Sequence, residues 1–583
     1  MKKIQKTLAL LLAMVMLLGL SACGTKEDED AWNVSYWIPK GVDSGYYAEY
    51  EENPVWQYIS ENYTFNGKKL KLDFLTAPPG SEAENWNNLI ATGDYCSIMN
   101  MSMASATATE MYEDGMIWDL TELIKEHAPN YVAYLDANPN LYNYVYTYVN
   151  GEAKILSLCG FSEEPGDNFQ GYCYRRDWVA KYGTNPTTGA AFTYGYTDPS
   201  DVNTWYDDVV FPSGETEPIY ISDWEWMFEI FVKAMDAQGI EDGYCFSPFY
   251  MGYMQTGDLY TGFGGGAPYW YYNGEEIVYG VIDDNMRAYL QCLNTWYEKG
   301  WADQAFDEHV GDMFFSQDTA TVYQGKVGLW QGITSQLGDG MAVEGTLTEG
   351  IVVYGCRQPI NDIYGGEEQQ NKTPNHMFQS AVNSSSVVFT DKMSEDEVIA
   401  VLELINFLFS EEGALLATCG LNAEQLATID SSFYDSLGLS SGAYTVEEVD
   451  GQTVYKHVLG TSDPAFNTVN LNYLDFRFGL TKQVNRGYTR IVEEALNAWD
   501  YYRCTAQLPR NVLNSVTAEQ NQEIAKIGSS LGQFEQKTIP LLIKGEGYDV
   551  WDDGEWEAFC KDITKRKAGM ITDIYNEILD TFQ

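Results

Sequence analysis

Histidine is the scarcest residue in this sequence, and its scarcity limits the chemistry that the chain can perform. Four histidines occur among 583 residues, and none stands at the spacing of a metal site or of a serine–histidine pair. The ten cysteines include no Cys-x-x-Cys motif, and nine remain without Cys23, an odd number. This pattern argues against a disulfide framework and against a zinc site. We therefore expect most cysteines to be small buried hydrophobic residues.

Basic residues are also few: 34 lysines and arginines stand against 85 aspartates and glutamates, a net charge of −51. A field of this sign repels nucleic acid and anionic lipid surfaces. We expect no nucleic acid partner, and we interpret the acidity as a means of solubility in an extracellular setting. The same balance disfavours an anionic sugar as ligand, although one well-placed arginine would override it.

Long hydrophobic runs are absent apart from one at the start. Lysines at positions 2, 3 and 6 precede an uncharged run over residues 7–22, which predicts a secretory signal peptide too short for an ordinary spanning helix. Residues 20–23 read LSAC and resemble the lipobox of bacterial lipoproteins, in which the thiol, here that of Cys23, is lipidated. The alternative is a plain signal peptide followed by a structural cysteine. We predict a signal peptide over 1–22 and a lipidated cysteine with a solvated tether over 23–31.

Aromatic residues, by contrast, are abundant: 43 Tyr, 25 Phe and 16 Trp make up 14% of the chain. Flat rings suit sugars, whose C–H faces stack on them while the hydroxyls form hydrogen bonds at the edge. Most of these rings must nevertheless pack in the core, because large aromatic side chains are mostly buried.

Strands and helices alternate along the chain, which predicts an α/β fold. Strands are expected within residues 33–40, 69–80, 96–101, 152–160, 325–332 and 350–359, and helices within 52–63 and 81–95. Three further helices have clear end signals. They are expected over 222–239, with a capping box of Ser222 and Glu225, over 283–300, and over 394–413, with a capping box of Ser394 and Glu397; each ends on a glycine.

The stretch 183–218 is rich in Gly, Pro, Thr, Asp and Tyr and predicts an irregular insertion. The chain is longer than one core supports, so two or more lobes are expected. No internal repeat or long low-complexity linker separates them. The lobes must therefore be joined by ordered crossings of the chain.

Three segments, in this order behind a lipobox, resemble the family 1 extracellular solute-binding proteins: YRRDWVAKYG, WYEKGWADQAF and VYQGKVGLWQG. No single segment is specific, and their order across nearly the whole mature chain carries the resemblance. It implies a periplasmic-binding-protein-like (type II) fold of two α/β lobes and a hinge, enlarged by insertions. The implied N-lobe is 32–157 plus 360–412, and the implied C-lobe is 158–359 plus 413–583.

The resemblance also implies a function. Members of this family capture sugars and oligosaccharides and deliver them to the permease subunits of an ABC importer. We accordingly expect a monomer, anchored by lipid to the outer face of the cytoplasmic membrane of a Gram-positive bacterium, with a carbohydrate ligand. A few larger members carry a calcium loop, but the segments DPSDVNTWYDD and WDDGEWE lack its spacing. We expect no cofactor, and calcium stays open as an alternative.

Ligands of open α/β folds lie beyond the carboxyl ends of the strands, which selects candidate residues. Trp37 ends the first strand out of phase with its apolar face, so it is a candidate for stacking on a sugar, with core packing as the alternative. Asn100 and Met101 follow a later strand at the expected rim. Trp330 and Gln331 end the strand GKVGLW, where members of the family often place an aromatic ring against the sugar.

Four more candidates come from flexible or charged segments. Tyr269 and Trp270 follow three glycines that let the backbone approach a ligand closely, although a surface hairpin explains them as well. Arg176, beside Asp177, can donate charged hydrogen bonds to hydroxyls or to a carboxylate, and a hinge salt bridge is the alternative. Arg357 has the same two interpretations.

Two other functions compete with sugar capture. A surface glycoside hydrolase would use paired carboxylates, but with 85 acidic residues such pairs carry no information without geometry. A binding protein for peptides or other non-sugar solutes would favour strand edges and charge clamps over stacked rings. We predict a binding protein and not an enzyme.

Overall fold

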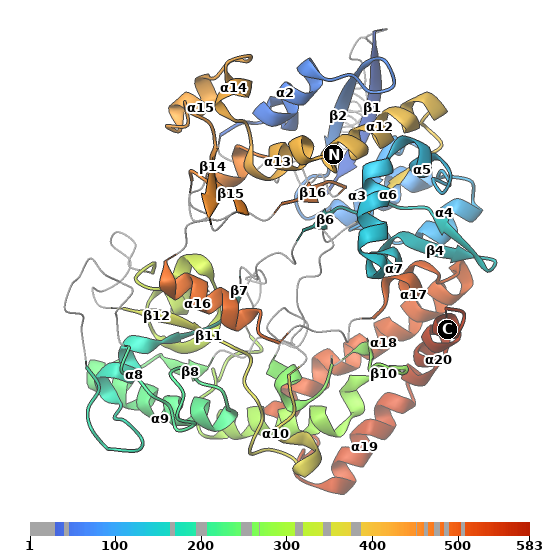
Figure 1. Ribbon diagram of the computed structural model, residues 1–583. Helices are drawn as coiled ribbons and strands as arrows, with labels where there is room; N and C mark the ends of the chain where they lie inside the picture. Colours follow the sequence, from blue (N-terminus) through green and yellow to red (C-terminus); the bar gives the residue numbers. More distant parts are fainter. Residues whose placement is uncertain are drawn as a thin grey trace, which may run out of the picture.

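The computed structural model of the chain describes residues 30–39, 46–163, 170–193, 207–246, 259–266, 269–308, 319–341, 351–374, 386–449, 452–459, 465–471, 478–482, 489–502 and 508–582. Two α/β bodies are visible in Figure 1, each with its own sheet and helices. The predicted signal peptide and Cys23 lie outside the described residues. Within the described part of the chain, no helix combines the length and apolar character needed to cross a bilayer.

The first body is built around a four-stranded sheet in the order β13-β3-β1-β2. Its strands are β1 (Ala31–Ile38), β2 (Lys69–Thr76), β3 (Ile98–Asn100) and β13 (Val387–Phe389). β1 pairs in parallel with β2 and β3, and β13 runs antiparallel to β3. Helices cover both faces of the sheet, because Val34, Tyr36 and Ile38 enter one hydrophobic core and Trp37 enters another.

The helices of the first body follow the predicted pattern closely. They include α2 (Pro54–Asn62), α3 (Glu82–Thr92) and α12 (Glu395–Leu408). α3 ends at Gly93, whose positive φ of 76° a glycine adopts at no steric cost. The capping box of Ser394 and Glu397 is confirmed.

The second body has a four-stranded sheet in the order β12-β7-β11-β8. Its strands are β7 (Gln170–Arg175), β8 (Tyr244–Phe246), β11 (Val327–Ile333) and β12 (Val353–Cys356). β7 runs antiparallel to β11 and β12, and β8 is parallel to β11. The sheet packs with α8 (Arg176–Tyr182), α9 (Ile221–Gln238) and α16 (Arg490–Trp499), and α10 (Asp284–Glu298), α18 (Ala518–Ile543), α19 (Asp553–Thr564) and α20 (Ala568–Asp580) extend the body.

The two hydrophobic cores place the boundaries between bodies differently from the sequence prediction. Tyr364 packs in the core of the second body, so 360–374 does not join the first. Leu416 and Leu480 pack in the core of the first body, so the predicted change of lobe at 412 comes too early. The described chain passes between the cores after Phe161, after Tyr364 and after Leu480.

A mistaken helix end explains the early boundary. Gly413 was expected to terminate a helix, but α12 ends at Leu408 and Ser410 begins α13 (Glu411–Cys419). The Ser410 hydroxyl accepts a hydrogen bond from the Gly413 amide at 3.1 Å, so this glycine lies in a first turn. The chain therefore continues in the first body.

The start of α9 also differs from the prediction. The residue before the helix is Tyr220, and the carboxylate of Asp223 accepts hydrogen bonds from the backbone amides of Ile219, Tyr220 and Ser213. Glu225 does not cap the helix. Its carboxylate instead accepts hydrogen bonds from two aromatic side chains, the Trp296 indole at 2.9 Å and the Tyr364 hydroxyl at 2.5 Å.

The C-terminal helices connect the two bodies. Figure 1 shows α17 (Arg510–Asn514) and α18 in red, running along one side of the molecule from the second body to the first. The Thr109 hydroxyl donates a hydrogen bond of 2.6 Å to the carbonyl of Asn514, and the Tyr148 amide donates to the Ser515 hydroxyl at 3.1 Å. The rings of Tyr148 and Phe582 lie 4.5 Å apart.

Candidate functional site

A pocket of about 560 Å³ lies on the second body and is a candidate site for a small ligand. Its walls come from β7, β12 and the residues that follow each of them, from one face of α16, and from positions 207, 216 and 217. The last three positions belong to the irregular insertion predicted over 183–218. Segments distant in sequence thus converge on one cavity.

Two glycines set the position of α16 against the sheet. A Cβ added at Gly355 on β12 would lie 2.4 Å from the Cβ of Ala495, and one added at Gly171 on β7 would lie 2.3 Å from the ring of Trp499. These approaches are closer than side chains allow, so only glycine permits the helix to pack here. The Trp499 indole also donates a hydrogen bond of 3.0 Å to the carbonyl of Tyr172. These contacts with β7 and β12 hold α16, which forms one wall of the pocket, in place.

Arg357 and Glu217 form one charged pair in the pocket. The guanidinium of Arg357 donates a hydrogen bond to the Glu217 carboxylate and lies 3.9 Å from the centre of the Tyr501 ring. Burial alone would lower the pKa of Arg357, but the bond to Glu217 and its charge raise this pKa above its usual value. The Tyr501 side chain is 58% exposed, so the pocket has an open aromatic ring at its edge.

Arg490, at the start of α16, forms a second charged group. It donates a hydrogen bond of 2.5 Å to Asp207 and lies 3.5 Å from Glu494, one turn along the helix. Arg490 also has a raised pKa: burial acts to lower it, and the bond to Asp207 and both nearby carboxylates act to raise it. Donors and acceptors therefore alternate along this wall.

Arg176 contributes the third guanidinium, from a buried position. It donates hydrogen bonds of 2.6 Å to the Tyr174 hydroxyl and to the carbonyl of Thr216, and it lies over the ring of Tyr354 at 4.7 Å. Burial raises the pKa of Tyr354 to about 12, although Arg176 acts in the opposite direction. Asp177 has another role. It forms a two-bond pair with Arg175 and accepts a hydrogen bond from the Val352 amide at 3.2 Å.

Among the predicted ligand-binding residues, Arg176 and Arg357 line the same pocket. Trp330 does not reach it. This tryptophan is fully buried in the core of the second body, and its indole donates a hydrogen bond of 3.0 Å to Gln336. Gln331 is buried next to it. The sheet is covered on both faces by helices, so neither side chain of this strand faces an open surface.

The candidates on the first body also lie inside it. Trp37 is 1% exposed and donates a hydrogen bond of 2.8 Å to the Asn85 side chain. The Asn100 side chain is buried and accepts a hydrogen bond from the Ser102 amide at 2.8 Å, which stabilises the turn after β3. Met101 packs, half-buried, against the core that contains Trp37. Core packing, the alternative stated for Trp37, describes its surroundings here.

Tyr269 and Trp270 lie at a hairpin of the second body, outside the pocket. Trp270 begins β9 (Trp270–Tyr272), which pairs with β10 (Ile277–Tyr279). Its indole donates a hydrogen bond of 3.0 Å to Thr572 of α20, and its ring lies 4.4 Å from that of Tyr279. Tyr269 is half-buried, and its carbonyl accepts a hydrogen bond from Gly280. The hairpin alternative fits this geometry.

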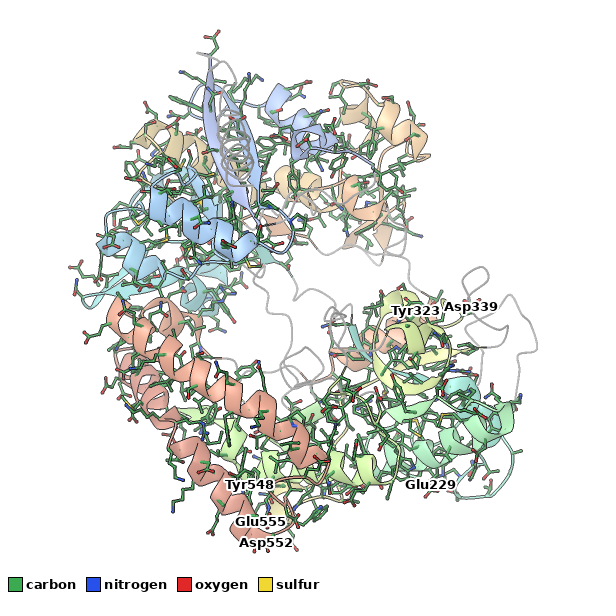
Figure 2. All side chains as sticks on the ribbon, turned by 180° about the vertical axis from the view of Figure 1, so that it is seen from behind. Glu229, Tyr323, Asp339, Tyr548, Asp552 and Glu555 are labelled. Atoms are coloured by element: carbon green, nitrogen blue, oxygen red, sulfur yellow. The ribbon has the colours of Figure 1, made fainter. Side chains whose placement is uncertain are left out.

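The acidic segment WDDGEWE has structural hydrogen bonds of its own. Figure 2 shows Tyr548, Asp552 and Glu555 together where α18 meets α19. Asp552 caps α19 by accepting a hydrogen bond from the Glu555 amide at 2.9 Å, and the Glu555 carboxylate accepts from the Asp549 amide at 2.7 Å. Most of the other acidic segment, DPSDVNTWYDD, lies outside the described residues, and its Asp207 pairs with Arg490.

Sequence reasoning missed Tyr501, Glu217, Asp207 and the whole of α16. A weak signal existed, since the sequence from the last residue of the helix onward reads WDYYR and combines rings with a cation. The ion pairs themselves carry no local signal, because Arg357 is 140 residues from Glu217 and Arg490 is 283 residues from Asp207.

No protein-family description matches the chain, and no curated protein matches its sequence. Solved structures match along almost its whole length. An extracellular solute-binding protein from Bifidobacterium longum subsp. infantis superimposes with a TM-score of 0.66 at 13% identity, over 96% of this chain and 100% of that one.

Two further structures agree with this match. A solute-binding protein from Bifidobacterium longum infantis, described as HMO-binding and associated with an ABC transporter, has a TM-score of 0.63 at 13% identity, over 95% of this chain and 99% of that one. The Streptococcus pneumoniae ABC-transporter substrate-binding protein FusA, in complex with kestose, has a TM-score of 0.61 at 15% identity, with the same coverage of 95% and 99%. The predicted fold class is confirmed: the chain has the two-body α/β fold of the periplasmic-binding-protein type.

Proposed function

We propose that this protein is a lipid-anchored extracellular solute-binding protein that captures a carbohydrate and delivers it to an ABC importer. The observation that carries the proposal is the pocket beside α16, in which guanidinium groups, carboxylates and an exposed tyrosine ring face one cavity. Sugars are bound by this combination of charged hydrogen bonds at the hydroxyls and a flat ring against the C–H face. The solved neighbours named for solute or sugar binding support it.

Binding, and not hydrolysis, is the function that these contacts favour. A glycoside hydrolase needs one carboxylic acid that donates a proton to the leaving oxygen. In the pocket, Glu217 and Asp207 each accept a hydrogen bond from an arginine, an arrangement suited to fixed recognition of hydroxyl groups. A peptide ligand would be expected to rely on backbone pairing with a strand edge, whereas the exposed Tyr501 ring beside Arg357 suits the C–H face of a sugar.

A thermal-shift screen tests the proposal. The protein without residues 1–23 is heated with mono- and oligosaccharides, peptides and calcium, and the glycans are then analysed for cleavage products. A ligand that binds only the folded state raises the melting temperature by mass action. A saturable shift with a class of oligosaccharide and no cleavage is the expected result. Shifts with peptides alone favour the peptide binder, and hydrolysis products favour the enzyme.

The anchor is a separate part of the proposal and has its own test. The sequence LSAC at 20–23 supports lipidation of Cys23. When the full chain is produced in a Gram-positive bacterium with a clickable palmitate analogue, we expect label on the wild type and none on Cys23→Ser. The wild type should also sediment with membranes, and the variant should be released into the medium.

A further inference from the structure

The pocket contains matched numbers of opposite charges. Among its described lining residues, the cations are Arg176, Arg357 and Arg490, and the anions are Asp207, Glu217 and Glu494. The carboxylates stand next to the guanidinium groups: Glu217 bonds to Arg357, and Asp207 and Glu494 both lie against Arg490. Two of the three guanidinium groups therefore already have carboxylate partners, and the third, Arg176, is buried and donates to the Tyr174 hydroxyl and the carbonyl of Thr216.

An acidic sugar would meet two electrostatic costs at this site. Its carboxylate would have to displace Glu217 or Asp207 from an arginine and would then lie beside the displaced anion, since all three acids line the same cavity. Like charges within a few ångströms repel strongly when water is partly excluded. Outside the pocket, the net charge of −51 adds a repulsive field along the approach.

A sugar hydroxyl meets neither cost. It can donate a hydrogen bond to a carboxylate oxygen and accept one from a neighbouring guanidinium, so an ion pair can bind one hydroxyl or two adjacent ones without separating. The ring of Tyr501, 58% exposed beside Arg357, offers a face for the C–H groups of the same sugar unit. The pocket is thus complementary to an uncharged polyol.

We propose that this pocket selects uncharged glycans over glycans that carry carboxylate or sulfate groups, and that Glu217 is the residue that enforces the choice. This inference rests on the proposed function and specifies its substrate class. Arginines in a sugar site are commonly read as a sign of an acidic ligand. Here the acidic residues beside them reverse that conclusion.

The experiment measures binding of the purified protein to a glycan array that carries neutral, uronate-containing, sialylated and sulfated glycans. Three chains are compared: the wild type, Glu217→Gln, and the control Glu493→Gln. Glu493 lies on α16, is exposed and does not line the pocket, so the control removes the same charge from the same region. Melting temperatures of all three establish that each is folded.

We expect wild-type signal on neutral glycans only. The affinity of Glu217→Gln for neutral glycans should fall about tenfold. The ratio of its affinity for acidic glycans to its affinity for neutral ones should rise by at least about tenfold, the change expected when the free energy of one charge interaction shifts by the equivalent of one pKa unit. The control should match the wild type. Wild-type binding to acidic glycans that equals or exceeds binding to neutral ones overturns the inference and leaves sugar capture intact. An absence of any glycan signal from a folded wild type overturns sugar capture itself.

Discussion

The two bodies have similar sheets and use them differently. Each sheet has three strands that run in one direction and one that runs against them, β13 at the edge of the first sheet and β7 inside the second, and each sheet is covered on both faces. In the first body both faces of the sheet pack into hydrophobic clusters, and after β3 the Asn100 side chain accepts a hydrogen bond from the Ser102 amide. In the second, α16 lies on the sheet through Gly171 and Gly355, and residues of the same helix, Ala495 among them, line a charged pocket.

The arginines are distributed unequally between the two bodies. The ten arginines are absent from positions 1–174 and 358–476, which hold most of the first body, and three of them line the pocket of the second. Because a guanidinium donates several directed hydrogen bonds, its distribution follows recognition more closely than total charge does. Three guanidinium groups thus lie in the pocket of the second body, where we propose that the sugar binds.

Removing a buried tryptophan from either body has the largest expected effect. Trp37→Ala and Trp330→Ala each leave a large cavity and should lower the free energy of unfolding by about 3–5 kcal/mol. Chemical denaturation measures this. Because neither ring lines the pocket, Trp37→Ala that remains folded at low temperature should keep its affinity for glycans. If Trp330→Ala melts like the wild type but no longer binds sugar, the assignment of Trp330 to the core is wrong.

A change of pH should affect the two bodies in opposite directions. Burial raises the pKa of Glu535 in the second body to about 7, from 4.5 in an exposed glutamate, and the Tyr279 hydroxyl donates a hydrogen bond to it. The folded state therefore binds the proton of the Glu535 carboxyl group more tightly than the unfolded state does. Protonation of Glu535 stabilises the fold fully below pH 4.5, and this contribution is lost as the pH rises through about 7. The magnitude is about 3 kcal/mol. Asp283, whose pKa burial raises to about 6, acts in the same direction.

Asp119 gives the first body the contrary dependence. Burial acts to raise its pKa, but hydrogen bonds from Lys154 and Thr121 outweigh burial and lower it, so its contribution is lost as the pH falls. Hydrogen exchange, followed by mass spectrometry of peptides from each body, measures the pH dependence of each body's stability separately. Glu535→Gln should protect second-body peptides at pH 8 and leave them unchanged at pH 4.5. If Glu535→Gln protects second-body peptides equally at both pH values, the titration of Glu535 does not cause the pH dependence of this body's stability.

Crowding α16 should have an intermediate effect. The methyl group of Gly355→Ala would meet Ala495, and overpacking of this kind costs about 1–3 kcal/mol. The displaced helix should also lower affinity for glycans in calorimetric titration, because Arg490 moves with it. Gly528→Ala on α18 is the matched control, since no atom lies within 4 Å of its added Cβ. Unchanged affinity in a destabilised Gly355→Ala would show that α16 does not shape the site.

Local signals predict helices and strands, whereas the lining of the pocket depends on contacts between distant segments. Ser394 with Glu397 marked the start of α12 correctly, and Gly239 marked the end of α9, because caps depend on neighbouring residues. For Trp37 the sequence left stacking on a sugar and core packing open, because a residue out of phase with an apolar face is exposed only when the other face of the sheet is uncovered; here both faces are covered.

The lining of the pocket has few local signals. Arg176 and Arg357 stood out as charged residues that could bind a ligand or form a hinge salt bridge, and both line the pocket. Their neighbours did not stand out, since Glu217 resembles any surface acid until the fold brings it to Arg357 from 140 residues away. Contacts of this separation depend on how the helices and insertion pack, which short sequence patterns do not report.

Replacing one exposed tyrosine in each body has the smallest expected effect on stability. It compares ligand binding by the two bodies most directly, because both hydrophobic cores stay intact. Tyr501 in the second body and Tyr46 in the first are both exposed, at 58% and 41%, so replacing either with alanine should alter the free energy of unfolding by no more than about 0.5 kcal/mol. Only Tyr501 lines the pocket, and loss of its ring should weaken glycan binding by about 1 kcal/mol, roughly fivefold. Titration calorimetry measures the glycan affinity of the two variants, whose free energies of unfolding should be alike. Equal losses of affinity would mean that the first body also contacts the sugar, and recognition would then have to be shared across both.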